Sequence, residues 1–155
     1  RPGEQHPSDW GNSFSHLYRS PPWNVGQEGN MGTVVLDHPA LGGFPHEGWC
    51  GAPFVPLIHG AHPLVLEWFR PARVEPIIRS IGHKNTMVDK AYLFEVGVGR
   101  GAVLATSLRL DTEAAWYAQP QTPYLLAALL GYAAGEDFHP RTTVARGQFA
   151  QALTE

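Results

Sequence analysis

Residues 90–110, KAYLFEVGVGRGAVLATSLRL, constrain the fold of this chain more than any other stretch. Apolar side chains alternate along both halves, and this period of two is typical of β-strands. The halves meet at residues 98–101, where Gly99 and Gly101 permit the positive φ angles and the bulge that a tight hairpin turn uses. Both faces of the first strand are apolar, which indicates a strand covered on both sides. In the first strand we expect one face to carry Tyr92, Phe94 and Val96 and the other to carry Ala91 and Leu93. In the second strand we expect Leu104, Leu108 and Leu110 to share one face.

The composition favours one folded domain and excludes several classes of partner. The chain has 155 residues with an apolar fraction of 43%, which is enough for a core of its own. Its net charge is −3 and its Lys and Arg residues form no cluster, so we expect neither nucleic acid nor an anionic membrane as the partner. No apolar run approaches the roughly 20 residues that span a bilayer.

The sequence divides into three parts. These are a loop-rich N-terminal wrap at 1–32, an α/β domain at 33–140 and a C-terminal tail at 141–155. The chain begins with Arg-Pro-Gly and contains neither an initial Met nor a signal-like segment, so we interpret it as a processed or excised piece of a longer protein.

Further elements are expected on both sides of the hairpin. Short β-branched or aromatic runs predict strands at 33–36, 64–69 and 74–81. Residues 123–134, PYLLAALLGYAA, predict the one strong helix, with Thr122 as its N-cap and Gly135 as its stop. Shorter helical segments are predicted at 39–43, 54–58, 112–118 and 146–153.

Four blocks, in this order, resemble the C-terminal region of large bacterial carbohydrate-active proteins, including family 2 glycoside hydrolases. The blocks are DHPAL at 37–41 with FPHEGWC at 44–50, VEPIIRSI at 74–81, YLFEVGVGRGAVLATSLRL at 92–110 and PYLLAALLGYAAGEDFHP at 123–140. The resemblance implies a flavodoxin-like domain with a mainly parallel sheet, akin to class I glutamine amidotransferase-like or beta-galactosidase trimerisation domains, or a truncated version of that fold. It also implies an accessory role in glycan degradation, an extracellular or periplasmic location, and catalytic carboxylates in a separate domain.

A thiol hydrolase is one alternative that the residues leave open. The segment Gly48-Trp49-Cys50-Gly51-Ala52 is similar to a nucleophile elbow, and His139 is a candidate base. No strand leads into Cys50, however, and a free cysteine is more often a small buried apolar residue. We therefore favour a structural role for Cys50.

A metal site is a second alternative. His38, His46, His59 and His62 are its candidate ligands, since zinc and copper sites use two or three histidines with a carboxylate. Their spacing is not diagnostic. The competing interpretation is that His38 and His46 hold their loops by hydrogen bonds to the backbone, and we expect no cofactor.

The tryptophans are the best ligand-binding candidates. Indole rings stack on the apolar C–H faces of sugars while their N–H group stays available for hydrogen bonding. Loop residues of this kind, with two polar neighbours, form the predicted ligand site: Trp10, Trp23, His46, Glu47 and Trp49. No catalytic carboxylate pair is recognisable, and we expect Glu95 to pair with Arg79 or Arg109 on a neighbouring strand.

Taken together, the residues and the resemblance predict a non-catalytic accessory domain of a carbohydrate-active protein, acting in assembly or in glycan contact. The expected partner is a glycan or the catalytic domain of a parent protein. A self-assembling structural protein, in which copies of the chain cover one another's sheet edges, is the remaining alternative.

Overall fold

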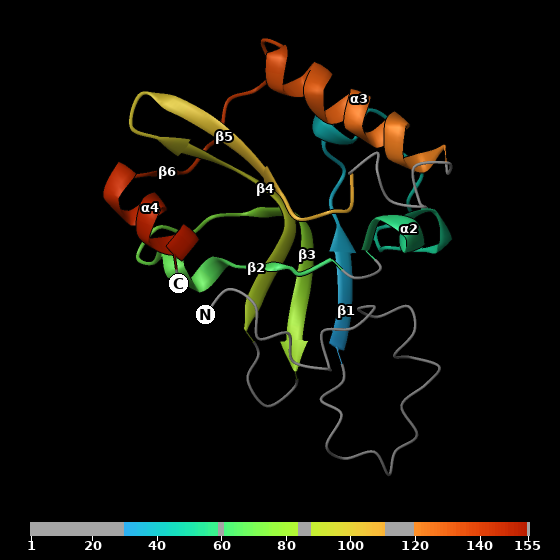
Figure 1. Ribbon diagram of the computed structural model, residues 1–155, viewed down its shortest axis with the longest axis horizontal. Helices are drawn as coiled ribbons and strands as arrows, with labels where there is room; N and C mark the ends of the chain where they lie inside the picture. Colours follow the sequence, from blue (N-terminus) through green and yellow to red (C-terminus); the bar gives the residue numbers. More distant parts are fainter. Residues whose placement is uncertain (1–29, 59–60, 84–87, 111–119, 155) are drawn as a thin grey trace.

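The computed structural model describes residues 30–58, 61–83, 88–110 and 120–154. Their core is one six-stranded sheet with short helices on both faces (Figure 1). The strands are β1 (Asn30–Val35), β2 (Leu64–Val65), β3 (Pro76–His83), β4 (Asp89–Val98), β5 (Gly101–Thr106) and β6 (Thr143–Val144). The helices are the 3-10 helices η2 (Pro39–Leu41), η3 (Ala52–Phe54) and η4 (Leu66–Phe69), and the α-helices α2 (Val55–Ile58), α3 (Gln121–Ala134) and α4 (Arg146–Thr154).

The predicted mainly parallel, flavodoxin-like sheet is wrong. Strands β1, β2, β3 and β5 all make antiparallel pairs, and the only parallel pair among the described residues joins β4 to β6. The connections explain this result. Parallel neighbours need a crossover of a dozen or more residues, usually a helix, whereas β3, β4 and β5 follow one another through short links. The parallel strands β4 and β6 are separated by a long stretch of chain that contains β5 and α3.

Strand β4 is the central strand of the sheet, and it is the first strand of the predicted hairpin. Strand β5 returns along it from the pair Val98–Gly101, so the two-residue turn is Gly99-Arg100, with φ of Gly99 at +62°. Strand β3 pairs with the first part of β4 and β6 with its end. The hairpin prediction is therefore confirmed.

The alternation along β4 is broken in one place. Phe94 and Val96 lie with Ala91 in one core cluster, whereas Tyr92 and Leu93 both lie in the other. The predicted grouping of Tyr92 with Phe94 is therefore wrong. The pairing between β3 and β4 shifts register in this region, and a bulge of this kind reverses which face the following residues occupy. The predicted shared face of β5 and its extension is confirmed, because Leu104, Leu108 and Leu110 all pack on one cluster.

Two clusters make the core, one on each face of the sheet. Helices α2 and α3 and the turns η2 and η3 cover one face, while η4 and α4 cover the other, and Figure 1 shows α3 and α4 on opposite sides. Leu125 and Leu129 bury the inner side of α3, and Leu130 on its outer side is 61% exposed.

Several local predictions are confirmed and others are corrected. Strand β1, the turns η2 and α2, and helix α4 occur where the sequence predicts them. Helix α3 is also present, but it starts at Gln121, after Pro120, so Thr122 is a buried helical residue and not the N-cap. The predicted strand at 64–69 is a two-residue strand followed by η4. No helix in the part of the chain that the structure describes is long and apolar enough to cross a membrane.

Candidate functional site

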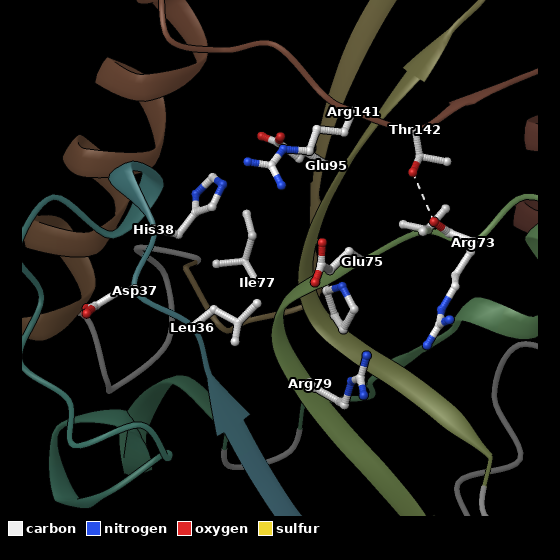
Figure 2. Close-up of a pocket in the computed structure, with 12 residues that line it drawn as sticks. Leu36, Asp37, His38, Arg73, Glu75, Ile77, Arg79, Glu95, Arg141 and Thr142 are labelled. Carbon is white, nitrogen blue, oxygen red and sulfur yellow. Dashed lines mark hydrogen bonds between the residues drawn. The ribbon is translucent and has the colours of Figure 1, made fainter.

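A cleft of about 520 Å³ opens where β1 ends and β3 begins. Polar side chains reach it from the segment after β1, from the segment around the start of β3, from the middle of β4 and from the segment before β6 (Figure 2). Its charged and polar lining consists of Asp37, His38, Arg73, Glu75, Arg79, Glu95, Arg141 and Thr142. Binding sites for small molecules in proteins commonly have volumes in this range.

His38 is held in one orientation at the edge of this cleft. Its Nδ1 atom accepts a hydrogen bond of 3.2 Å from the backbone N–H of Ala40, so His38 caps η2. Its ring makes an edge-on contact with Tyr132, with centroids 5.3 Å apart. Burial lowers the pKa of His38, the Glu95 charge partly offsets this effect, and Arg141 lowers the pKa further. The imidazole is therefore neutral at pH 7 and carries its proton on Nε2.

Glu95 is the carboxylate that β4 contributes to the cleft. The Tyr132 hydroxyl donates a hydrogen bond of 2.7 Å to Oε2 of Glu95, so helix α3 fixes this carboxylate. Burial, and then this hydrogen bond, raise the pKa of the Tyr132 phenol far above its usual range. The expected pairing of Glu95 with Arg79 is wrong, because Arg79 instead lies 3.4 Å from the Asp89 carboxylate. The alternative pairing with Arg109 stays a prediction.

Arg73 and Arg141 enter the cleft from two segments that are tied together. The Thr142 hydroxyl donates a 2.9 Å hydrogen bond to the Arg73 carbonyl (Figure 2), and the Thr142 carbonyl accepts one of 2.8 Å from the N–H of Gly97 on β4. Neither guanidinium has an ion-pair partner among the described residues. The cleft therefore contains two arginines that form no direct ion pair with its described carboxylates.

A second pocket has a volume of about 390 Å³. It lies in the loop between η2 and η3 and is lined by Pro45, His46, Glu47, Trp49, Gly51, Ala52 and Pro53. Trp49 is 39% exposed there, which is unusual for a side chain of its size. His46 of this pocket contacts Asp37 of the cleft, since its Nε2 atom lies 3.4 Å from the Asp37 carboxylate.

Backbone hydrogen bonds fix the loop that carries Trp49. The N–H of Val35 on β1 donates to the Gly48 carbonyl at 2.9 Å, and the N–H of Cys50 donates to the Thr33 hydroxyl at 2.9 Å. Gly48 itself has a backbone φ of +80°, which residues other than glycine rarely adopt. The indole is thus presented by a loop that is anchored to β1 on both sides of Trp49.

The comparison with known families decides where this chain belongs. The family model described as "Domain of unknown function (DUF8487)" matches residues 2–154. The chain belongs to the DUF8487 family. A search of curated proteins found no match to it.

Three of the five predicted ligand residues come together in the DUF8487 structure. His46, Glu47 and Trp49 line one pocket, while Trp10 and Trp23 lie outside the described residues. The backbone-holding interpretation of the two loop histidines is confirmed. The Nδ1 atoms of His38 and His46 accept from the N–H groups of Ala40 and Gly48, each at 3.2 Å.

The thiol-hydrolase alternative does not fit the geometry. Cys50 is completely buried in the core cluster, and burial raises the pKa of its thiol to about 12. A nucleophilic cysteine needs an accessible thiolate. His139 is exposed beyond the end of α3, so the two residues share no accessible site. The structural role of Cys50 is therefore confirmed.

The described residues do not support the metal-site alternative. Among the described residues, no group of three or more His, Cys, Asp or Glu side chains is placed to hold a metal ion. His38 and His46 each use one ring nitrogen for a backbone contact, His62 is exposed, and His59 lies outside the described residues.

Sequence reasoning missed the charged cleft. Glu95 was the available signal, since it is the one carboxylate in the otherwise apolar run YLFEVGV. Its partner Tyr132 and the nearby Arg141 lie 37 and 46 residues further along the chain, and only the crossover through α3 brings them to β4. No local spacing could indicate this arrangement.

The assembly prediction stays a prediction. Helix α3, QTPYLLAALLGYAA, contains no charged residue and exposes Tyr124 by 50% and Leu130 by 61%. Its outer face is therefore more apolar than that of most surface helices.

Proposed function

We propose that this DUF8487 chain is a non-catalytic accessory domain of a carbohydrate-active protein and that it contacts glycan through Trp49. The observation that carries the proposal is the pocket in which the exposed Trp49 indole lies beside His46 and Glu47. The resemblance of the sequence to accessory regions of such proteins supports the same role and an extracellular or periplasmic setting.

The chemistry of the pocket suits a sugar ring. A flat indole offers the apolar surface on which the C–H face of a pyranose can stack. The carboxylate of Glu47 and the imidazole of His46 lie at the same pocket and can hydrogen-bond to the hydroxyl groups at the edge of the sugar. Pro45 and Pro53 supply further apolar wall. Apolar walls with a few polar groups are the usual composition of a ligand site.

The anchored loop favours binding by reducing its entropic cost. Ligands lose affinity when a binding loop must be ordered, whereas hydrogen bonds to β1 already hold the residues on both sides of Trp49. The non-catalytic part of the proposal rests on the buried Cys50 thiol and on the resemblance, in which another domain supplies the hydrolytic carboxylates.

Calorimetric titration with a panel of oligosaccharides tests the proposal. We expect one glycan class to bind, and Trp49→Ala to weaken that binding by about tenfold or more, which corresponds to about 1.4 kcal/mol. Trp49→Phe should retain part of the affinity because it keeps a smaller aromatic surface.

Trp68→Phe is the matched control. It also removes an indole, but Trp68 packs against the cluster on the opposite face of the sheet. The proposal fails if no glycan binds, or if Trp49→Ala binds as tightly as the wild type and the Trp68→Phe control.

A further inference from the structure

We infer that the charged cleft continues the Trp49 pocket and selects acidic glycans, whose sugar rings carry carboxylate groups. The inference rests on the proposed glycan contact and names the class of glycan that the combined surface would take.

One side-chain contact links the linings of the two cavities. Asp37 lines the cleft and His46 lines the Trp49 pocket, and their carboxylate and Nε2 atoms are 3.4 Å apart. The Asp37 side chain is fully exposed and points away from the centre of the cleft (Figure 2), so this contact lies at the rim of the cleft. The inference requires a chain of sugars stacked on Trp49 to pass this contact and reach the cleft.

Two of the three arginines in the cleft are available for an anion. Arg79 is 3.4 Å from Asp89, whereas Arg73 and Arg141 have no carboxylate partner among the residues that the structure describes. Their backbone segments are tied by the hydrogen bond from Thr142 to the Arg73 carbonyl, and Figure 2 shows the Arg141 guanidinium directed toward His38 and the Arg73 guanidinium directed away from it. Guanidinium groups bind carboxylates through two parallel hydrogen bonds, which makes a carboxylate the fitting counterion.

The remaining groups in the cleft suit the hydroxyls of a sugar. Glu75 and Glu95 both line it, and Figure 2 shows Glu75 directed into the space between Ile77 and the β4 ribbon. Carboxylates accept hydrogen bonds from hydroxyl groups. The neutral His38 ring adds an Nε2–H donor at the edge of the cleft.

This mixture of charges argues against two simpler ligands. A small inorganic anion would use the arginines but would be repelled by Glu75 and Glu95 without using them. A neutral sugar would use the carboxylates but would offer the two guanidiniums only hydroxyl oxygens as acceptors. A sugar that bears both hydroxyls and a carboxylate uses both sets of groups.

Paired probes that differ only in charge test the inference. Oligogalacturonate carries a carboxylate on every ring, and its fully methyl-esterified form has the same backbone without those charges. We expect the wild-type chain to bind the acid at least about tenfold more tightly than the ester, and to lose this preference at high salt. Arg141→Gln and Arg73→Gln should each weaken binding of the acid by about tenfold and leave binding of the ester unchanged.

Two further variants separate this inference from the function on which it rests. Arg100→Gln removes an exposed arginine from the β4–β5 turn, outside the cleft, and should bind the acid as the wild type does. Trp49→Ala should weaken both probes. Equal wild-type affinity for acid and ester, with no effect of the Arg141 and Arg73 variants, would overturn the acidic-glycan inference and leave the Trp49 contact standing. Binding of neither probe, and of no member of the wider panel, would overturn both.

Discussion

Replacement of Gly42 by alanine should destabilise the protein through the turn that positions His38. Gly42 follows η2 in the left-handed conformation, with φ of +56°. A Cβ atom on Gly42 would lie 2.7 Å from the Cβ of Ala128 on α3, closer than real Cβ atoms approach one another. The neighbouring atom belongs to a helix packed on the core and has no flexible end that can move aside.

Two independent terms give the size of the effect. The left-handed conformation costs an L-residue about 1–2 kcal/mol. Forcing an extra methyl group into a packed contact typically costs about 1–3 kcal/mol. We therefore expect Gly42→Ala to lower the free energy of unfolding by about 2–5 kcal/mol, a large part of the roughly 5–15 kcal/mol typical of a domain.

Urea denaturation followed by circular dichroism measures this change, and Gly131→Ala is the matched control. Gly131 is an exposed residue inside α3, and a Cβ there would meet no atom within 4 Å. Alanine is the better helix former, so this variant should gain about 0.5–1 kcal/mol. The reasoning is refuted if Gly42→Ala unfolds within about 0.5 kcal/mol of the wild type.

The other predictions concern buried polar groups. Tyr132→Phe removes the hydrogen bond to the Glu95 carboxylate and should lower the free energy of unfolding by about 1–2 kcal/mol in urea denaturation, because this partly buried bond has a charged acceptor. A loss no larger than that of Tyr124→Phe, which removes an exposed hydrogen bond to Gly42, would contradict this. The pKa of Cys50 is raised from 9.0 to about 12 by burial, so the folded state holds the thiol proton more tightly than the unfolded state. The stability from this group is therefore complete below pH 9 and falls between pH 9 and 12, by up to about 1.4 kcal/mol per pH unit. Urea denaturation at several pH values should show a shallower decline for Cys50→Ala, and an identical decline would contradict the burial argument.

Local sequence patterns predicted the elements better than their arrangement. Three local patterns predict the hairpin, α3, α4 and the turn at η2. They are the alternation of apolar residues, apolar residues at helical spacing, and proline or glycine at the ends of elements, and each extends over only a few residues. The sheet direction depends on what connects the strands. The resemblance implies the parallel sheet of a flavodoxin-like fold, whereas β3, β4 and β5 follow one another through short links. Those links alone require antiparallel neighbours.

The site was predictable where it is local and unpredictable where it is not. His46, Glu47 and Trp49 lie within four consecutive positions of one loop, and the pocket there collects all three. The cleft draws Glu95 from β4 and Arg141 from beyond α3, and it is completed by residues near the start of β3. Its formation depends on the parallel pairing of β6 with β4, which no short-range pattern encodes.

The measurement that tests the central claim most directly is a titration of the ¹⁵N-labelled chain with the glycan that binds best, followed through the Nε1–H resonances of its indoles. The account predicts that the Trp49 resonance, assigned with Trp49→Phe, shifts and saturates with the dissociation constant found by calorimetry. The Trp68 resonance should stay in place, because that ring packs on the opposite face. A Trp49 resonance that does not move while glycan binds would contradict the account.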